Sequence, residues 1–187
     1  METINLNALR DRAYKTACEH GFHDEEFSNE HLLCLVISEL MEAVEADRKE
    51  QFAKVPVDKK GTIFDERTFH YQNKYFAENF EAYIKDRVED ELSDVVIRLL
   101  DLAGLRNLNL NRFALVNVVS KKKAFTENIY AIVKDIMNYK YSLEEQVNYA
   151  ITQVFVLADI IGIDLLWHIE QKMRYNELRP MLNGKRY

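Results

Sequence analysis

The segment SELMEAVEADRKE, residues 38–50, places glutamates on a helical face that is otherwise apolar. The spacing predicts a helix over about residues 28–51, and at about 100° per residue five of its side chains share one narrow arc: Leu32, Leu35, Glu39, Glu42 and Ala46. The other side of this helix is also apolar in its first half, which predicts that the helix is buried. We therefore expect Glu39 and Glu42 to occupy a buried face, with Glu45 extending the arc toward solvent.

The stretch VEDELSDVVIRLLDLAG, residues 88–104, presents a second acid pair in a similar position. It belongs to a helix predicted at about residues 84–106, with a core stripe formed by Val88, Leu92, Val95, Leu99 and Leu102. Glu91 borders this stripe, Asp94 lies one turn further on, and Arg98 falls between their angles a turn later. Two helices thus each present acids at i and i+3 beside their core-facing sides.

Four carboxylates that converge between two packed helices repel one another, at a cost on the order of 4 kcal/mol for each close pair. Protonation or a bound cation relieves this repulsion. Oxygen ligands without nearby His or Cys favour a hard ion, Mg²⁺ first and Mn²⁺ as the alternative. Acid pairs at this spacing also occur on solvated faces, so the metal interpretation depends on both pairs adjoining core stripes. A di-iron bundle is disfavoured, because the chain contains no Glu-x-x-His sequence.

Composition favours a helical protein without affinity for nucleic acid or membranes. Of the 187 residues, 48% are hydrophobic and 30% are charged, with only five Gly and two Pro. The formal net charge of −6 argues against nonspecific binding to nucleic acid or to anionic membrane surfaces. The polar N-terminus predicts no signal peptide, and polar residues interrupt the longest apolar stretch, residues 150–167, which predicts a buried helix rather than a membrane span.

The whole chain, residues 1–187, is expected to form one all-α domain. Periodicity and stop signals predict further helices at residues 5–20, 112–122, 127–138, 142–161 and 165–178. Gly21 and Gly162 end two of them, and a capping box starts the helix after residue 142. Cys18 and Cys34 lie in apolar helical patterns outside any C-x-x-C pair, so we expect buried, reduced thiols in a cytoplasmic protein.

Seven aromatic residues between positions 64 and 83 are expected to pack in the core or at a dimer interface, although one ring could stack on a base: Phe64, Phe69, Tyr71, Tyr75, Phe76, Phe80 and Tyr83. A faint repeat also relates two segments, because the sequence from Glu91 aligns without gaps on the sequence from Gln146. In the second copy Gln146 and Tyr149 replace Glu91 and Asp94. Chance similarity between two amphipathic helices explains this alignment equally well.

Several motifs together resemble the MazG-like, all-α nucleoside triphosphate pyrophosphohydrolases. The segment ISELMEAVEADRKE followed by VEDELSDVVIRLLDLAG matches their signature of E-x-x-E on one helix and E-x-x-D on the next. The ending HIEQKMRYNELRPMLNGKRY and the segment EHGF, residues 19–22, are similar to one branch of that family. The similarity covers residues 13–53, 84–106 and 160–187. It implies an all-α helical bundle of this pyrophosphohydrolase type.

The resemblance implies a Mg²⁺-dependent enzyme that cleaves a nucleoside triphosphate between its α and β phosphates, as a house-cleaning activity on the nucleotide pool. The family's metal-binding and catalytic positions fall on Glu39, Glu42, Glu91 and Asp94, and Glu45 matches a further acid in a supporting or base role. Substrate-binding positions fall on Lys172 and Asn176, with Tyr175, Arg179, Lys185 and Tyr187 as their companions. By charge, Arg98 or Arg179 could complete a phosphate clamp beside Lys172.

The chain departs from compact members of the family by an insertion over about residues 107–157, which predicts an inserted helical pair. Lys172 and Asn176 follow this insertion, so they could lie on a different helix path from the one in compact members. Compact relatives assemble their bundle from several chains, so a homo-oligomer, a dimer or tetramer, is expected. Two alternatives remain open. One is a non-catalytic helical interaction protein with a vestigial metal site, and the other is a phosphoribosyl-ATP pyrophosphohydrolase.

Overall fold

Every regular element in the described part of the chain is helical. The computed structural model describes residues 4–60, 64, 73–110, 118–138 and 140–184, and these ranges contain no strand. The helices are α1 (Leu6–Glu19), α2 (Asn29–Arg48), α3 (Val57–Lys60), α4 (Asn73–Tyr83), α5 (Val88–Leu105), α6 (Phe125–Asn138), α7 (Leu143–Ile160) and α8 (Leu165–Glu177), followed by a 3₁₀ helix at Met181–Gly184. The prediction of an all-α fold is confirmed.

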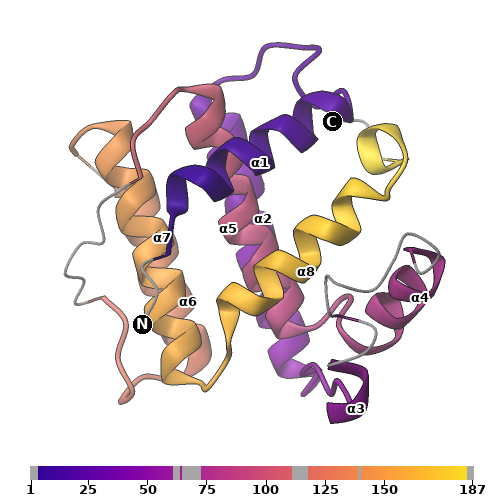
Figure 1. Ribbon diagram of the computed structural model, residues 1–187. Helices are drawn as coiled ribbons and strands as arrows, with labels where there is room; N and C mark the ends of the chain where they lie inside the picture. The colour runs from indigo at the N-terminus through magenta and orange to yellow at the C-terminus, as the bar shows by residue number, and fades with distance from the viewer. Residues whose placement is uncertain (1–3, 61–63, 65–72, 111–117, 139, 185–187) are drawn as a thin grey trace.

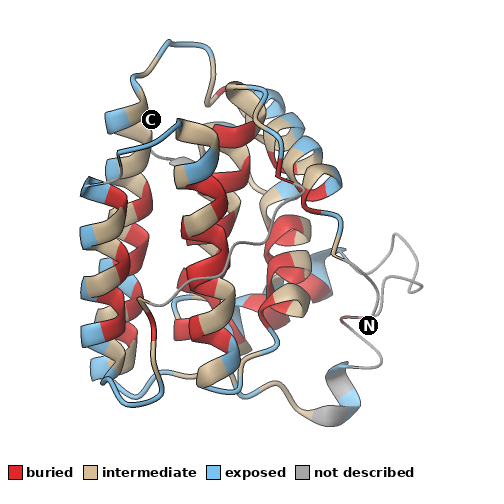
Figure 2. Ribbon diagram, turned by 90° about the vertical axis from the view of Figure 1, so that its left-hand side faces the viewer, coloured by how far each residue is buried: buried red, intermediate tan, exposed pale blue. Residues whose placement is uncertain are grey.

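Helix α5 is the centre of the molecule. It packs against α1, α2, α7 and α8, while α6 packs against α2 and α7. Figure 1 shows α2 and α5 side by side, with α6 and α7 to their left and α8 running obliquely across α5. The buried sides of these helices face one another in the interior (Figure 2). Because most of α5 is buried, the acids in its first turns lie inside the protein.

Capping residues bound two helices, α1 and α7, where the sequence predicts. Gly21 follows α1 with φ +78°, and the amide of Phe22 donates to the carbonyl of Ala17, so α1 ends in a Schellman turn. Gly162 ends α7 in the same left-handed conformation, with φ +79°. The capping box predicted at the start of α7 is present. The segments that follow both turns contact α5, through His23 after α1 and through α8 after α7.

The segment between α5 and α8 contains two helices, α6 and α7, which pack over α2 and α5. The helix predicted at residues 112–122 is wrong for residues 118–122, which turn before α6, and residues 112–117 lie outside the described ranges. The side chain of Asn128 holds this turn by accepting from the amide of Ser120 at 2.9 Å and donating to its carbonyl at 3.1 Å. Side-chain bonds of this kind compete with helical ones, which periodicity does not register.

The aromatic stretch forms a small cluster separate from the main core. The buried residues of this cluster are Phe64, Phe76 and Phe80 of the stretch, together with Ile84 and Tyr175. Core packing is therefore confirmed for three of the predicted rings, and no described residue of this stretch lines the cavity described below. Phe69 and Tyr71 lie outside the described residues.

Both cysteines are exposed, so the prediction of buried thiols is wrong. Cys18 lies opposite the buried side of α1, and Cys34 lies opposite the buried side of α2. An apolar neighbourhood in sequence therefore did not mean a buried position. In the described part of the chain, no single helix is long and apolar enough to cross a membrane, and α7 and α8 meet these criteria only as a pair bent by 116°.

Candidate metal site and adjoining cavity

Three carboxylates from two helices converge near the N-terminal end of α5. Glu39 of α2 and Glu91 and Asp94 of α5 each offer a carboxylate oxygen, and these oxygens lie within 4.8 Å of one another. Glu39 and Glu91 are buried and Asp94 is half-buried. This group, called the acid cluster below, could hold a metal ion, because hard cations take oxygen ligands.

Burial and mutual repulsion disfavour the charged forms of the acid cluster. Burial raises the pKa of Glu91 to about 8, and the carboxylates of Asp90 and Asp94 add to the rise. Burial also raises the pKa of Glu39, with Asp94 adding to the effect and Arg98 opposing it. A bound divalent cation would favour the ionised carboxylates and so reverse both shifts. The donor set therefore fits a hard divalent cation.

Glu42 and Glu45 lie at the edge of the site rather than inside it. Glu42 is exposed, so its predicted burial is wrong, because its angular position is displaced from the buried side of α2. Its charge makes the smallest contribution to the raised pKa values of Glu39 and Glu91, after burial and the nearer charged groups. Glu45 is exposed and pairs with Lys49 at 3.0 Å, so its carboxylate is engaged at the surface.

Lys172 of α8 joins the acid cluster to a further buried acid, Asp90. The Lys172 Nζ lies 2.7 Å from Asp90 Oδ1 and 2.8 Å from Asp94 Oδ2. Burial by itself lowers the pKa of Lys172, but the carboxylates of Asp94 and Asp90 outweigh it and raise the pKa above its usual value. Burial raises the pKa of Asp90 to about 6, against the attraction of Lys172. The helices that precede α8 in the chain thus leave Lys172 in contact with the acids.

Arg98 of α5 binds Glu39, the member of the acid cluster that belongs to α2. Its Nε donates to Glu39 Oε1 at 2.5 Å, and its side chain is 28% exposed. The i, i+4 spacing would allow a pair with Asp94 on the same helix, but the structure pairs Arg98 across to α2. The remaining N–H groups of the guanidinium lie beside the cavity and can donate to a ligand.

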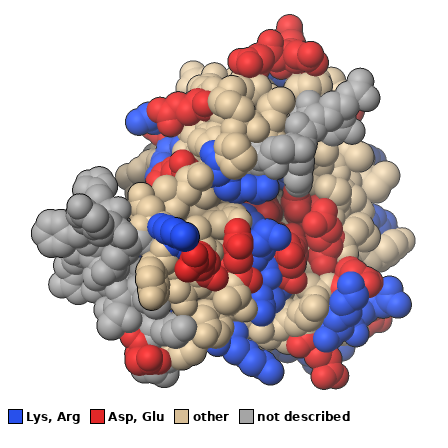
Figure 3. All heavy atoms as spheres, turned by 90° about the vertical axis from the view of Figure 1, so that its right-hand side faces the viewer, with Lys and Arg blue, Asp and Glu red and all other residues tan. Residues whose placement is uncertain are grey.

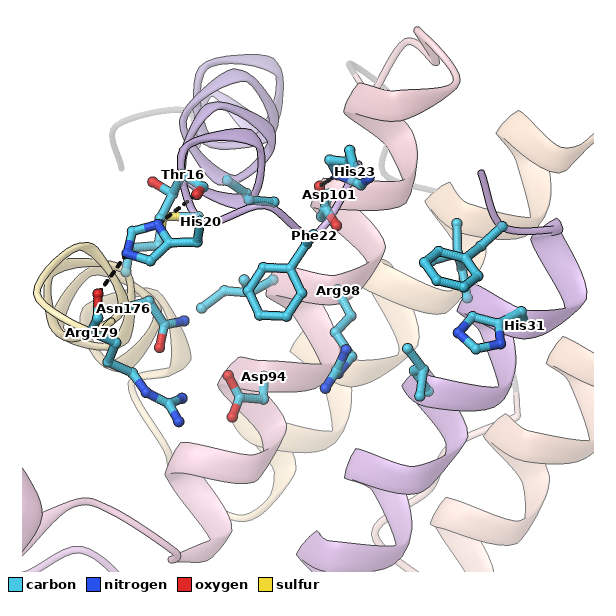
Figure 4. A pocket seen from close by; sticks show the side chains of 17 residues that line it. Thr16, His20, Phe22, His23, His31, Asp94, Arg98, Asp101, Asn176 and Arg179 are labelled. Atoms are coloured by element: carbon cyan, nitrogen blue, oxygen red, sulfur yellow. Dashed lines mark hydrogen bonds and ion pairs between the residues drawn. The ribbon is translucent and has the colours of Figure 1, made fainter. Parts of the chain in front are cut away.

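A cavity of about 120 Å³ opens beside the acid cluster, lined by α1, α2, α5, α8 and the loop after α1. Asp94 and Arg98 belong to both the cavity and the charged site. In Figure 4, Asp94, Arg98 and Arg179 lie around one end, and Phe22 projects into the space between α8 and α2. Much of the remaining wall is apolar, formed by Ala13, Ala17, Phe27, Leu32, Leu35, Ile97 and Met173. A ligand with a charged end and a flat apolar part would match this lining.

The loop between α1 and α2 supplies several cavity residues and is held by α5. The Schellman turn at the end of α1 precedes Phe22 and His23, and His23 Nε2 lies 2.7 Å from Asp101 Oδ1. Arg106, just after α5, donates to the carbonyl of Phe27 at 2.7 Å. Contacts from the C-terminal half of α5 therefore hold this loop in place over the cavity.

Two of the predicted substrate-binding residues at the end of α8 line the cavity. Asn176 has a buried amide oxygen that, among the described residues, accepts no hydrogen bond. Arg179 is anchored through its carbonyl, which lies 2.9 Å from Nε2 of His20. Asn176 therefore offers an acceptor to a ligand, and the backbone at Arg179 is tied to the end of α1.

Tyr175 faces away from the cavity. Its hydroxyl donates to Glu81 at 2.7 Å, and its ring stacks on Phe80 with centroids 4.4 Å apart. The structure therefore places Tyr175 between α8 and α4 rather than with the other predicted substrate-binding residues. Lys185 and Tyr187 lie outside the described residues.

Sequence reasoning did not single out Asp90, His23 or Asp101. The i, i+4 spacing of Asp90 and Asp94 in the first turns of α5 is a signal that could have found Asp90. His23 and Asp101 are 78 residues apart, and no local pattern links them. Only the packing of the loop against α5 reveals this pair.

The face on the right of Figure 1 carries acidic and basic side chains side by side around its middle (Figure 3). This mixed surface agrees with the net charge of −6 and differs from the basic stripe typical of nucleic-acid binding. Comparisons of the chain with models of protein families, with curated proteins and with solved structures found no match.

Proposed function

We propose that this protein is a Mg²⁺-dependent pyrophosphohydrolase that converts a nucleoside triphosphate to a nucleoside monophosphate and pyrophosphate. The observation that carries the proposal is the acid cluster, whose three carboxylate oxygens lie within 4.8 Å of one another beside a cavity with an apolar wall. A triphosphate with bound cations matches the acids, and a nucleoside matches the cavity. The E-x-x-E and E-x-x-D signature of the MazG-like family supports the same activity.

The reaction transfers the nucleotidyl group of the substrate, which contains the α-phosphorus, to water. A bond forms between the water oxygen and the α-phosphorus, the bond to the oxygen that bridges the α and β phosphates breaks, and pyrophosphate leaves. When bound, Mg²⁺ neutralises phosphate charge and makes the attacking water more acidic. Glu39, Glu91 and Asp94 would hold the metal, with Glu42 at their edge. A carboxylate of this group that is not bound to metal accepts the water proton.

The remaining polar residues position the substrate. Arg98 and Arg179 line the end of the cavity that contains Asp94, where their guanidinium groups can donate to phosphate oxygens. Lys172 contacts Asp94 directly, so it orients this carboxylate and lowers the negative charge around it. The amide oxygen of Asn176 is suited to accept a hydrogen bond from a sugar hydroxyl.

The test is pyrophosphate release from a panel of ribo- and deoxyribonucleoside triphosphates in Mg²⁺, with phosphoribosyl-ATP included. We expect release from at least one nucleoside triphosphate, lost in Asp94→Asn and retained in Glu19→Gln, which removes an exposed carboxylate on α1. Circular dichroism would check that both variants keep their helices. Full activity of Asp94→Asn would show that the acid cluster takes no part in the reaction.

Two outcomes would favour the alternatives. Release from phosphoribosyl-ATP alone would identify a phosphoribosyl-ATP pyrophosphohydrolase instead. No release from any compound, by a folded protein that binds Mg²⁺, would support a helical binding protein that retains the metal site.

A further inference from the structure

A carboxylate–imidazole pair lies in the cavity away from the acid cluster. Asp101 follows Asp94 by seven residues on α5, so the two side chains point in nearly the same direction about 10 Å apart along the helix. Asp101 and His23 both line the cavity, and their side chains are only 19% and 11% exposed. A ligand with phosphates at Asp94 could therefore reach Asp101 with its far end.

This pair offers hydrogen-bond acceptors to the cavity. An ionised carboxylate only accepts, so Nε2 of His23 donates to Oδ1 of Asp101 across 2.7 Å. Within the described part of the chain, the second oxygen, Oδ2, accepts no hydrogen bond. Because Asp101 lines the cavity, its second carboxylate oxygen presents lone pairs to a ligand there.

The ring of Phe22 lies between the charged end of the cavity and this pair, as Figure 4 shows. A base in this space could stack on the aromatic face, while its hydrogen-bonding edge continues toward Asp101. The distance of about 10 Å along α5 is comparable to the span from the α-phosphate of a nucleotide to the far edge of its base. A nucleotide bound in this way would bring the edge of its base to Asp101.

We propose that Asp101, positioned by His23, selects nucleotides whose base carries an exocyclic amino group. This inference rests on the proposed function, because it assigns the substrate class of the same site. The amino group of cytosine or adenine donates to the carboxylate. Uracil, thymine and hypoxanthine have a carbonyl oxygen at that position, and two acceptors facing each other in a buried site repel. A site that binds a polar group rejects analogues that cannot pair with it.

Two matched substrate pairs test this proposal, because CTP and UTP, like ATP and ITP, differ chiefly in an amino group replaced by a carbonyl. In the native protein we expect kcat/KM to favour the amino member of at least one pair by ~10-fold or more. Asp101→Asn should reduce this ratio by ~10-fold or more, because an amide can turn its NH₂ toward a carbonyl. Asp11→Asn, which changes an exposed aspartate on α1, should leave the ratio unchanged.

The Asp101→Asn variant also distinguishes base recognition from a structural role of the His23–Asp101 pair. The amide oxygen of Asn can still accept from His23, so the melting temperature should change little while the ratio changes. A lower melting temperature with an unaltered ratio would show that the pair only holds the loop on α5, and would overturn the proposal. A native ratio near one, or in favour of UTP and ITP, would also overturn it.

Binding of the monophosphates gives a readout that needs no hydrolysis. By calorimetry, CMP should bind more tightly than UMP, and Asp101→Asn should abolish the difference. If this preference is found without pyrophosphate release from any triphosphate, the proposed reaction fails and the assignment of Asp101 stands. If release is found without an amino preference, the reaction stands and the assignment of Asp101 fails.

Discussion

Lys172 and His168 lie one turn apart on α8, and burial affects them in different ways. Both side chains are buried. Lys172 remains charged because Asp90 and Asp94 lie within 2.8 Å of its ammonium group. Burial lowers the pKa of His168 to about 4, with the charge of Lys60 adding to the effect, so the imidazole is neutral in the folded protein. At the scale of the residue, the partner decides which buried group carries charge.

Removal of the Lys172 charge should destabilise the protein strongly. Lys172→Met leaves Asp90 and Asp94 buried without their cation, and breaking a buried ion pair in this way costs ~3–5 kcal/mol. Urea unfolding at neutral pH without divalent cations would measure the loss. Lys74→Met is the control, because Lys74 is 89% exposed on its side chain and should contribute little. A loss for Lys172→Met as small as that of the control would contradict the importance of this ion pair.

His168 should make the folded state less stable in acid. The unfolded chain binds a proton near pH 6.5, whereas the folded chain does so only near pH 4. Between these values the unfolded state holds more protons, so the free energy of unfolding rises with pH and falls as the pH drops, by on the order of 3 kcal/mol at most. Urea unfolding between about pH 4 and pH 6.5 should show that the free energy of unfolding rises less steeply with pH in His168→Gln than in the native protein. An equal dependence on pH in the native protein and in His168→Gln would show that His168 does not cause the loss of stability in acid.

Helix α1 approaches α5 closely at Gly104. A Cβ atom added to Gly104 would lie 2.4 Å from the Cβ atom of Tyr14, which is too close for two side-chain carbons. Helix α1 also lines the cavity, so this contact helps to set the width of the site. At the scale of the element, a glycine inside a helix is therefore explained by packing and not by a turn.

The contact at Gly104 gives a prediction whose sign is opposite to helix propensity. Alanine in a helix interior is favoured over glycine by about 1 kcal/mol. Because the new methyl group clashes with Tyr14, we expect Gly104→Ala instead to destabilise the protein by ~1–3 kcal/mol. Thermal unfolding would measure the change. Stabilisation by Ala would mean that α1 can move away from α5 without cost.

At the scale of the whole molecule, the fold brings three remote segments to one site. Helix α2 supplies Glu39, α5 supplies Glu91 and Asp94, and α8 supplies Lys172. The α6–α7 pair packs over α2 and α5, and α1 and α8 also pack against α5. Neighbouring helices therefore hold the two acid-bearing helices, α2 and α5, in place. A homo-oligomer stays a prediction, which light scattering would test.

Mg²⁺ should stabilise the whole molecule, because it binds the folded acid cluster and relieves its repulsion. A cation at a hundred times its dissociation constant adds about 2.7 kcal/mol. We therefore expect millimolar Mg²⁺ to raise the Tm by several degrees, and EDTA to reverse the rise. Glu91→Gln should abolish the shift, while Glu19→Gln should retain it. An unchanged Tm in native protein would count against the metal site.

The sequence by itself determined the long helices α1, α2, α5, α6, α7 and α8, several of their caps and three of the acids that meet. Apolar periodicity and the residues Gly21 and Gly162 depend on local geometry, which the chain encodes directly. The tertiary structure alone decided that Glu42 is exposed, that Lys172 lies between Asp90 and Asp94, and that His23 meets Asp101. The physical reason is that periodicity indicates one face of one helix. What covers that face, and which remote charge approaches it, depends on how the helices pack.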